Sequence, residues 1–310
     1  VRPIAAASIG QVHRAQTKDG RDMAIKVQYP GVARSIDSDV ANVGALMRMS
    51  GLLPKGFDLA PYLQDACKQL HEETDYSREA EQMKRFRELL ADAPAFVVPQ
   101  HYEDWSTRHI LAMEFISGQP IEAADQAPQA VRDQIATQLI DLTLRELFEF
   151  GEMQTDPNFA NYMFQEDSGR IVLLDFGAAR RLDPQIVEQY SRLMRAGRAG
   201  DTDTLRVAAS DIGFIGTETE ERHKTRVIRL IQMAFEALAL APVTDFSEMV
   251  SLSRKMQAEG MILAEEGFVP PPLPIDVLLL QRKFGGMFLL AARLRARVAT
   301  EAMFDRYLCS

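Results

Sequence analysis

The feature that most constrains the fold is a pair of polar motifs in the middle of the chain. Residues 154–161 are Gln-Thr-Asp-Pro-Asn-Phe-Ala-Asn, and a second motif, Asp175-Phe176-Gly177, follows an apolar run at 171–174. Short apolar runs bounded by turn residues are typical of buried strands. We therefore predict a hairpin of two strands, 159–164 and 171–174, that brings Asp175 beside Asn161.

Two carboxylates and one carboxamide in this order are typical of a phosphoryl-transfer centre. In protein kinases a loop aspartate orients the nucleophile, a loop asparagine binds a metal ion, and the aspartate of Asp-Phe-Gly binds the metal that bridges the ATP phosphates. On this pattern Asp156 is a catalytic residue, and Asn161 and Asp175 are metal ligands. The motifs predict ATP or ADP and Mg²⁺ as cofactors.

A strand near the N-terminus carries a lysine suited to such a centre. Residues 11–17 and 22–29 have the pattern of two strands joined at Asp19-Gly20, a dipeptide typical of hairpin turns. Met23-Ala24-Ile25-Lys26 matches the Val-Ala-Ile-Lys pattern of the kinase strand whose lysine holds the α- and β-phosphates. Taken alone, the pattern at Lys26 favours an edge-strand lysine facing water. The downstream motifs favour the phosphate-binding role.

Two other segments are predicted to contact a nucleotide. The small residues at 5–10 are predicted to form a loop that lets the backbone approach a ligand closely. A strand predicted at 109–116, which follows another at 96–102, stops at a Gly/Pro turn, as the hinge between two lobes would. There, backbone groups of Glu114 and Ile116 could bond an adenine. An ordinary buried strand end is the alternative.

A strongly helical pattern at 59–90 contains an acidic run, residues 72–75. On a continuous helix, Glu72, Asp75 and Glu79 would lie on one face. The run is either a solvated face, the usual meaning of clustered charge, or the source of a glutamate that pairs with Lys26 as a kinase requires.

The rest of the chain is predicted to be mainly helical. Candidate helices are 32–49, 127–150, 184–196, 202–212, 218–239, 247–258 and 275–298. The last helix carries the basic residues Arg282, Lys283, Arg293, Arg295 and Arg297 in a chain of net charge −9. Salt bridges to the acidic body are the favoured explanation for these residues, ahead of contact with an anionic membrane surface.

Composition argues against several classes of protein. The net charge of −9 argues against nucleic-acid binding. The two cysteines, Cys67 and Cys309, make a disulfide framework improbable and favour a reducing compartment; we expect a cytoplasmic protein, at most peripheral to a membrane. No uncharged apolar run reaches the roughly 18 residues of a membrane span.

Motifs of two other classes of site are absent from the sequence. The sequence lacks the Gly-x-Gly-x-x-Gly turn of dinucleotide-binding oxidoreductases. Its histidines show no metal-ligand spacing, which favours structural roles for them: His13, His71, His101, His109 and His223.

These motifs together resemble the UbiB/AarF/ADCK family of atypical kinase-like proteins, which is linked to ubiquinone (coenzyme Q) biosynthesis. The resemblance runs from Ala5 to about Arg297. Residues 5–12 resemble the family's alanine-rich loop, and 73–76 resemble its Glu-x-Asp segment. Residues 154–158 replace the His-Arg-Asp catalytic loop, and 282–286 resemble the C-terminal helix of the ADCK-type subgroup.

The resemblance implies a protein-kinase-like bilobal α+β fold. Residues 1–116 would form a small β-rich N-lobe with a helical insert, and residues 117–310 a large, mainly helical C-lobe. The implied catalytic residues are Asp156 and Lys26, and the implied metal ligands are Asn161 and Asp175. The implied nucleotide-site residues are Ala5, Ala6, Ala7, Ser8, Lys26, Glu73, Glu79, Met113, Glu114 and Ile116.

Within that set the resemblance implies particular roles. Glu79 would pair with Lys26, with Glu73 as the alternative partner, and Met113 would be the gatekeeper before the hinge. Glu73 would contact the family's inhibitory Lys-x-Gly-Gln motif. That motif is absent from these 310 residues. Since it belongs upstream of the alanine-rich loop and the chain begins at Val1, we expect the sequence to be part of a longer protein.

The resemblance leaves three functions open. The favoured one is an atypical kinase-like ATPase that supports ubiquinone biosynthesis. The second is a small-molecule or lipid phosphotransferase, because no Ala-Pro-Glu follows Asp-Phe-Gly and a peptide-binding segment is therefore not expected. The third is a nucleotide-gated scaffold of a membrane-associated biosynthetic complex. The implied partners are a nucleotide, a membrane surface or lipid, and ubiquinone-biosynthesis enzymes, with no nucleic acid.

Overall fold

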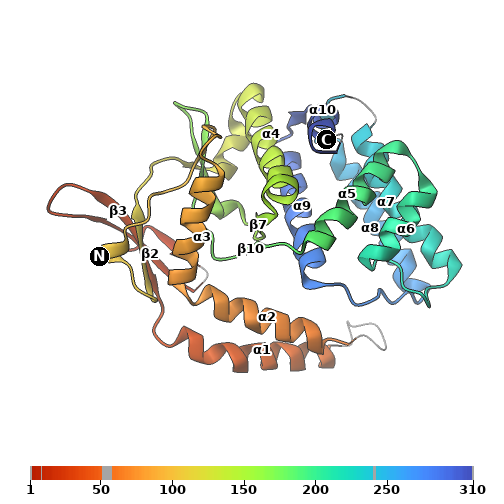
Figure 1. Ribbon diagram of the computed structural model, residues 1–310, viewed down its shortest axis with the longest axis horizontal. Coiled ribbons are helices and arrows are strands. Elements are labelled where there is room, and N and C mark those ends of the chain that lie inside the picture. The colour runs from red at the N-terminus through yellow and green to blue at the C-terminus, as the bar shows by residue number, and fades with distance from the viewer. Residues whose placement is uncertain (1, 8, 51–57, 240–241, 309–310) are drawn as a thin grey trace. The chain divides into compact units, whose positions relative to one another are not determined.

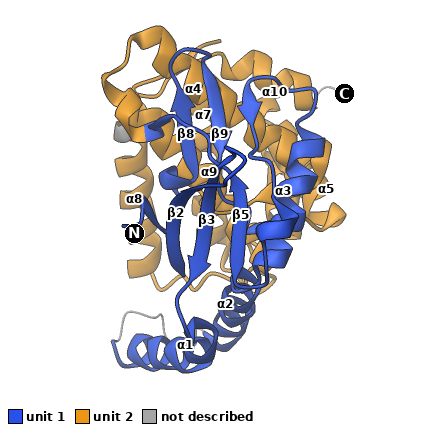
Figure 2. Cartoon of the chain, turned by 90° about the vertical axis from the view of Figure 1, so that its left-hand side faces the viewer, with its two compact units in different colours: residues 1–53, 58–121, 158–179 blue, residues 54–57, 122–157, 180–310 orange. Residues whose placement is uncertain are grey.

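The computed structural model describes residues 2–7, 9–50, 58–239 and 242–308 (Figure 1). The chain forms two compact units (Figure 2): unit 1 comprises residues 1–53, 58–121 and 158–179, and unit 2 comprises 54–57, 122–157 and 180–310. The segment 158–179, which holds the second predicted motif, thus belongs to the same unit as the N-terminal strands. The lobe boundary at residue 116 stays a prediction.

An antiparallel sheet of four strands, in the order β1-β2-β3-β5, forms one part of unit 1. Its strands are β1 (Ala5–Ala7), β2 (Gly10–Gln16), β3 (Asp22–Gln28) and β5 (Ile110–Glu114). The prediction of a loop at 5–10 was wrong for Ala5–Ala7, which pair with residues 10–12 of β2. Because alanine side chains are too small to hinder strand pairing, the backbone of this segment can form ladder hydrogen bonds with β2 rather than remain an unpaired loop. Gly10 has a different role, because a Cβ there would lie 2.2 Å from the Val27 carbonyl oxygen.

Three helices accompany this sheet in unit 1: α1 (Val32–Met49), α2 (Ala60–Glu73) and α3 (Tyr76–Leu89). The bounds of α1 match the prediction. Gly51 and Pro54, residue types that favour the end of a helix, lie outside the described residues. The continuous helical face expected from Glu72 to Glu79 was wrong. Asp75 adopts extended backbone and accepts a hydrogen bond from the Ser77 N–H at 3.0 Å. Because aspartate is a strong N-cap, the helix breaks there and α3 starts afresh.

A second sheet in unit 1 has the order β4-β9-β8-β6. It comprises β4 (Phe96–Val97), β6 (Gln119–Pro120), β8 (Tyr162–Gln165) and β9 (Arg170–Leu173). The predicted hairpin is confirmed, since β8 and β9 pair antiparallel with Tyr162 opposite Leu173. Its first strand is shorter than predicted, because Phe159–Asn161 form a 3-10 turn. The ladder continues one step further, where the Leu174 N–H donates to the Asn161 carbonyl at 2.9 Å. The strand predicted at 96–102 is much shorter than expected and covers only Phe96–Val97.

Unit 2 is mainly helical. Its long helices are α4 (Gln129–Arg145), α5 (Pro184–Ala199), α6 (Thr202–Ile212), α7 (Glu221–Ala239), α8 (Met249–Glu265), α9 (Ile275–Arg293) and α10 (Thr300–Leu308). A single π-helical turn, Glu146–Phe150, extends α4. Two short strand pairs complete the unit: β7 (Glu152–Gln154) pairs with β10 (Ala179–Arg181), and β11 (Thr244–Asp245) pairs with β12 (Arg297–Val298). In its core, α4 and α9 bury apolar side chains that include Ile135, Leu139 and Leu280. None of the described helices combines the length and the apolar composition of a membrane span.

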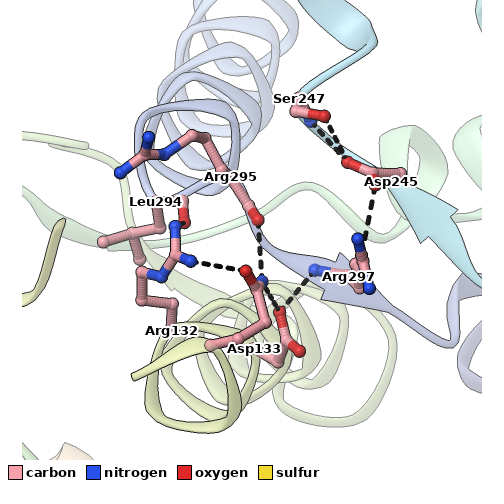
Figure 3. A network of polar contacts seen from close by, with 8 residues as sticks. Arg132, Asp133, Asp245, Ser247, Leu294, Arg295 and Arg297 are labelled. Carbon is pink, nitrogen blue, oxygen red and sulfur yellow. Dashed lines mark hydrogen bonds and ion pairs between the residues drawn. The ribbon is translucent and has the colours of Figure 1, made fainter. Parts of the chain in front are cut away.

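The basic C-terminal segment is not one helix, contrary to the prediction for 275–298. Helix α9 ends at Arg293, and Arg295 has a φ of 49° in the left-handed region. The turn is held because Arg132 on α4 donates to the Leu294 carbonyl at 2.8 Å and the Arg297 N–H donates to Asp133 at 2.6 Å (Figure 3). These contacts satisfy backbone groups that the helix end leaves exposed.

Three of these five basic residues make ion pairs within unit 2, in line with the favoured explanation. Arg282 pairs with Asp156 at 2.6 Å, Lys283 with Glu146 at 3.5 Å and Arg297 with Asp245 at 3.2 Å. Lys283 is only 1 % exposed, so it lies in the interior of the unit and does not contribute to a basic surface.

Candidate active site

A buried lysine and two carboxylates form the centre of the candidate site in unit 1. The Lys26 Nζ lies 2.6 Å from the Glu79 Oε1 and 2.8 Å from the Asp175 Oδ2. Lys26 and Glu79 are 5 % and 4 % exposed. A buried charge is tolerated only with partners, and here one ammonium is shared by two carboxylates. Of the two glutamates considered from the sequence, Glu79 is therefore the one that pairs with Lys26.

Three elements place these side chains. Strand β3 carries Lys26 opposite Leu111 of β5, so the lysine stem lies in the middle of the sheet. The cap at Asp75 puts Glu79 in the first turn of α3. The segment after β9 carries Asp175, whose Oδ1 accepts the Gly177 N–H at 2.9 Å. The local backbone thus fixes all three groups before any ligand contributes.

Helix α3 holds the Asp-Phe-Gly segment through two contacts that the sequence did not reveal. The Arg78 guanidinium donates to the Gly177 and Ala179 carbonyls at 2.8 and 2.7 Å. The rings of Phe86 and Phe176 lie 5.3 Å apart, and both side chains are fully buried. Arg78 and Glu79 are consecutive residues in the first turn of α3, so no helical spacing indicated that both would contact the Asp-Phe-Gly segment.

The electrostatics of the centre follow from one cation beside two anions. Burial, together with the negative charge of Asp175, raises the pKa of Glu79 to about 7. Burial opposes the ionisation of Asp175, but the Lys26 charge and hydrogen bonds outweigh it and hold the pKa of Asp175 below its usual value. Burial likewise opposes the Lys26 charge, and the two carboxylates more than offset it, so the pKa of Lys26 is raised. Near neutral pH, protonation of Glu79 therefore decides whether Lys26, Glu79 and Asp175 together carry a net charge of zero or −1.

The raised pKa of Glu79 predicts how stability depends on pH. Because the folded state binds this proton more tightly than the unfolded chain, the stabilising contribution is full below about pH 4.5 and is lost as the pH rises through about 7. Glu79→Gln cannot titrate. We expect the difference in free energy of unfolding, wild type minus variant, to fall between pH 5 and 8. Urea denaturation followed by circular dichroism measures this difference.

The matched control is Glu73→Gln, whose free energy of unfolding should follow the wild-type dependence on pH. If the free energy of Glu79→Gln changed with pH in parallel with that of the wild type, the raised pKa of Glu79 would be contradicted.

The residues predicted as metal ligands lie close together in the fold of unit 1. Asn161 precedes β8 and Asp175 follows β9, so the hairpin brings both to the same end of the two strands. Carboxylate and carboxamide oxygens are the hard donors that Mg²⁺ prefers. The centre also has one more carboxylate than cation, and a divalent ion would compensate this charge. The donor set and its charge therefore fit Mg²⁺.

The remaining nucleotide-site candidates of unit 1 are spread over several elements. Ala5, Ala6 and Ala7 form β1, while Ser8 lies outside the described residues. Met113 is buried opposite Ala24, and the Glu114 N–H donates to the Gln100 carbonyl at 2.8 Å. Ile116 lies two residues beyond the end of β5. Glu73 ends α2 and accepts a hydrogen bond from Gln69 at 3.3 Å.

Asp156 belongs to unit 2, where helix α9 holds its loop. The Arg282 guanidinium lies 2.6 Å from the Asp156 Oδ1. One turn further along α9, a Cβ on Gly286 would lie 2.2 Å from the Pro157 Cβ, so only glycine lets the loop pack here. The sequence resemblance at 282–286 therefore has a local structural reason: these residues are shaped to the segment that carries Asp156.

Comparison with known proteins identifies the family. The ABC1 atypical kinase-like domain matches residues 1–209. The chain belongs to this family. The ABC1 assignment agrees with the resemblance to UbiB/AarF/ADCK proteins, and it covers the Lys26, Glu79 and Asp175 centre together with the loop of Asp156.

Curated relatives extend the match over nearly the whole chain. The chain is 40% identical over 304 residues to "Atypical kinase COQ8B, mitochondrial" of Rattus norvegicus, covering 98% of this chain and 57% of the relative. It is 34% identical over 304 residues to "Atypical kinase COQ8, mitochondrial" of Saccharomyces cerevisiae, covering 97% of this chain and 60% of the relative. The chain thus spans little more than half the length of these relatives.

A solved structure supports the fold. The complex of Rv3197 with erythromycin from Mycobacterium tuberculosis superposes with a TM-score of 0.75 at 24% identity, covering 99% of this chain and 76% of that one. The ABC1 chain therefore has the expected kinase-like α+β fold, with the small sheet of β1, β2, β3 and β5 and a mainly helical second unit.

Proposed function

We propose that the chain is an atypical kinase-like enzyme that binds ATP or ADP with Mg²⁺ and hydrolyses ATP, or transfers its phosphoryl group, in support of ubiquinone biosynthesis. The observation that carries the proposal is the buried ion pair of Lys26 with Glu79 and Asp175. Phosphoryl transfer in kinases requires a lysine–glutamate pair and a metal-binding aspartate at the same time. The names of the COQ8 relatives support the link to a kinase-like activity.

Each residue has a role that follows from its chemistry. Lys26 binds phosphate oxygens, and Glu79 keeps its ammonium in place and charged. Asp175 and Asn161 hold Mg²⁺, which when bound supplies positive charge to the phosphates. Asp156 orients the attacking hydroxyl or water. Because transfer of a phosphoryl group depends mainly on positioning and charge, these contributions suffice without a covalent intermediate on the protein.

Nucleotide binding provides the first test. A ligand that binds only the folded state stabilises it by about 2.7 kcal/mol at a concentration of 100 times its Kd. We expect Mg²⁺ with ADP or ATP to raise the melting temperature, and Mg²⁺ alone to raise it less. In Lys26→Ala the nucleotide-dependent rise should vanish. Differential scanning fluorimetry with and without Mg²⁺ measures these shifts.

The matched control is Lys18→Ala, since Lys18 is an exposed lysine in the turn between β2 and β3. It should keep the full shift. A nucleotide-dependent shift of wild-type size in Lys26→Ala would contradict the assigned role of this lysine. Absence of any shift in the wild-type chain would contradict nucleotide binding itself.

One observation favours a second candidate, a nucleotide-gated scaffold with little turnover. In unit 2 the Asp156 carboxylate is already paired with Arg282 at 2.6 Å, and this pairing competes with a role in orienting a nucleophile. Measurement of phosphate release and of label transfer from ATP to a prenylated phenol separates the three functions. Free phosphate indicates an ATPase, a labelled phenol indicates a phosphotransferase, and nucleotide-dependent liposome binding that persists in Asp156→Ala indicates a scaffold.

A further inference from the structure

A cluster of three side chains on the α1–α2 pair lies outside the centre described above. The Asp37 Oδ1 lies 3.0 Å from the Cys67 Sγ and 3.0 Å from the His71 Nε2. Ligand atoms of all three residues lie within 4.8 Å of one another. Asp37 is on α1, and Cys67 and His71 are on α2. One thiol, one imidazole and one carboxylate thus converge from two helices.

Helix geometry explains the convergence. Helices α1 and α2 lie side by side (Figure 1), and their contact includes Gly44, where an added Cβ would lie 2.4 Å from the Leu63 Cδ1. Asp37 is seven residues before Gly44 (44 − 37), so it lies two turns away on the same face of α1. Cys67 and His71 follow Leu63 by four and eight residues, so both lie on the face of α2 that meets α1. All three side chains therefore flank the line of contact between the helices.

We propose that Asp37, Cys67 and His71 form a binding site for a divalent transition-metal ion of the Zn²⁺ type. Thiolate, imidazole and carboxylate are the three protein ligands that Zn²⁺ uses, with bonds of about 2.0–2.3 Å. A tetrahedral ion of that size needs ligand atoms roughly 3.5 Å apart. Two of the three separations are 3.0 Å and the third is at most 4.8 Å, so each lies within about 1.3 Å of this value, a difference that side-chain rotation can supply.

The position of the site also suggests its effect. Three protein ligands leave one tetrahedral position for water, as in open zinc sites. The Asp37 side chain is 76 % exposed and that of His71 is 42 % exposed, so an ion can enter from solvent. Because the ligands come from both helices, a bound ion cross-links α1 and α2 and stabilises their pairing. The site is separate from the Lys26 centre and does not depend on the proposed function.

Cobalt spectroscopy tests the site in the whole chain. Co²⁺ replaces Zn²⁺ in such sites, and a thiolate ligand gives a charge-transfer absorption in the near ultraviolet. We expect this band on titration of the reduced chain with Co²⁺, and its loss on addition of Zn²⁺. Cys67→Ser should abolish the band. His71→Ala should weaken Co²⁺ binding at least about 10-fold, the lower end of the range for disturbing a metal site.

Two matched variants control the experiment. Cys309→Ser removes the other cysteine of the chain and should leave the band unchanged. Asp39→Asn changes an exposed aspartate two residues from Asp37, so on a different face of α1, and should bind as wild type, whereas Asp37→Asn should bind more weakly. Circular dichroism confirms that each variant is folded. A band that is absent in wild type, that persists in Cys67→Ser, or that is equally weak in both aspartate variants would overturn the proposal.

Discussion

Replacing Asp175 by asparagine is expected to lower Mg²⁺-dependent nucleotide turnover on the order of 100- to 1,000-fold, the range for removing one group that stabilises transition-state charge. Asparagine has nearly the same shape, but it lacks the charge that pairs with Lys26 at 2.8 Å and binds a divalent ion. Lys26 keeps its second partner, Glu79 at 2.6 Å, so the fold should persist. Phosphate release at saturating ATP over a range of Mg²⁺ concentrations measures the effect.

The matched control for this variant is Asp167→Asn. Asp167 is an exposed aspartate in the turn between β8 and β9, on the same hairpin that positions Asp175. This control should retain wild-type turnover and Mg²⁺ dependence. If Asp175→Asn left both turnover and the affinity for Mg²⁺-nucleotide unchanged, Asp175 would not be a metal ligand of the reaction.

The centre around Asp175 was predictable because local patterns determine it. Strand β3 and hairpin β8–β9 are short segments bounded by turns, and the candidate site residues lie on or directly beside them. The sequence therefore predicted where Lys26, Asn161 and Asp175 lie in these elements, while their roles stay predictions. The family match over residues 1–209 then confirmed the kinase-like fold that these motifs imply.

The choice between Glu73 and Glu79 depended on one residue, Asp75. A continuous helix would have placed Glu72, Asp75 and Glu79 together. The cap at Asp75 instead separates α2 from α3, and Glu79 in the first turn of α3 is the glutamate that pairs with Lys26. Aspartate before a helical run with an acidic residue in the first turn is a start signal, so this break was available from the sequence.

Other features depend on contacts between distant segments and had no local signal. Arg295 adopts a left-handed backbone that is usually filled by glycine, and contacts with α4 hold it there. The end of α9 at Arg293 was therefore missed. The cluster of Asp37, Cys67 and His71 was missed for the same reason, because its third member comes from a different helix whose register Gly44 and Leu63 help to set.

The buried pair of Lys283 and Glu146 in unit 2 provides the largest expected effect on stability. The Lys283 Nζ lies 3.5 Å from the Glu146 Oε2, and the two side chains are 2 % and 1 % exposed. Lys283→Met removes the cation and leaves the carboxylate buried. Breaking such a pair from one side costs about 3–5 kcal/mol. We expect that loss in the free energy of unfolding at pH 7, measured by urea denaturation.

Two further variants make the test specific to the pair. Burial already raises the pKa of Glu146 against the attraction of Lys283, so without the lysine the carboxyl gains even more by protonation. The deficit of Lys283→Met should therefore shrink as the pH falls toward 5. Adding Glu146→Leu should restore most of the stability, since apolar groups can replace a buried ion pair at little cost.

The control is Arg282→Met on the same helix. Arg282 also forms an ion pair, with Asp156, but its side chain is 54 % exposed, so this change should cost less than about 1 kcal/mol of unfolding free energy. Equal losses in Arg282→Met and Lys283→Met would contradict a special contribution of the buried pair to the stability of unit 2.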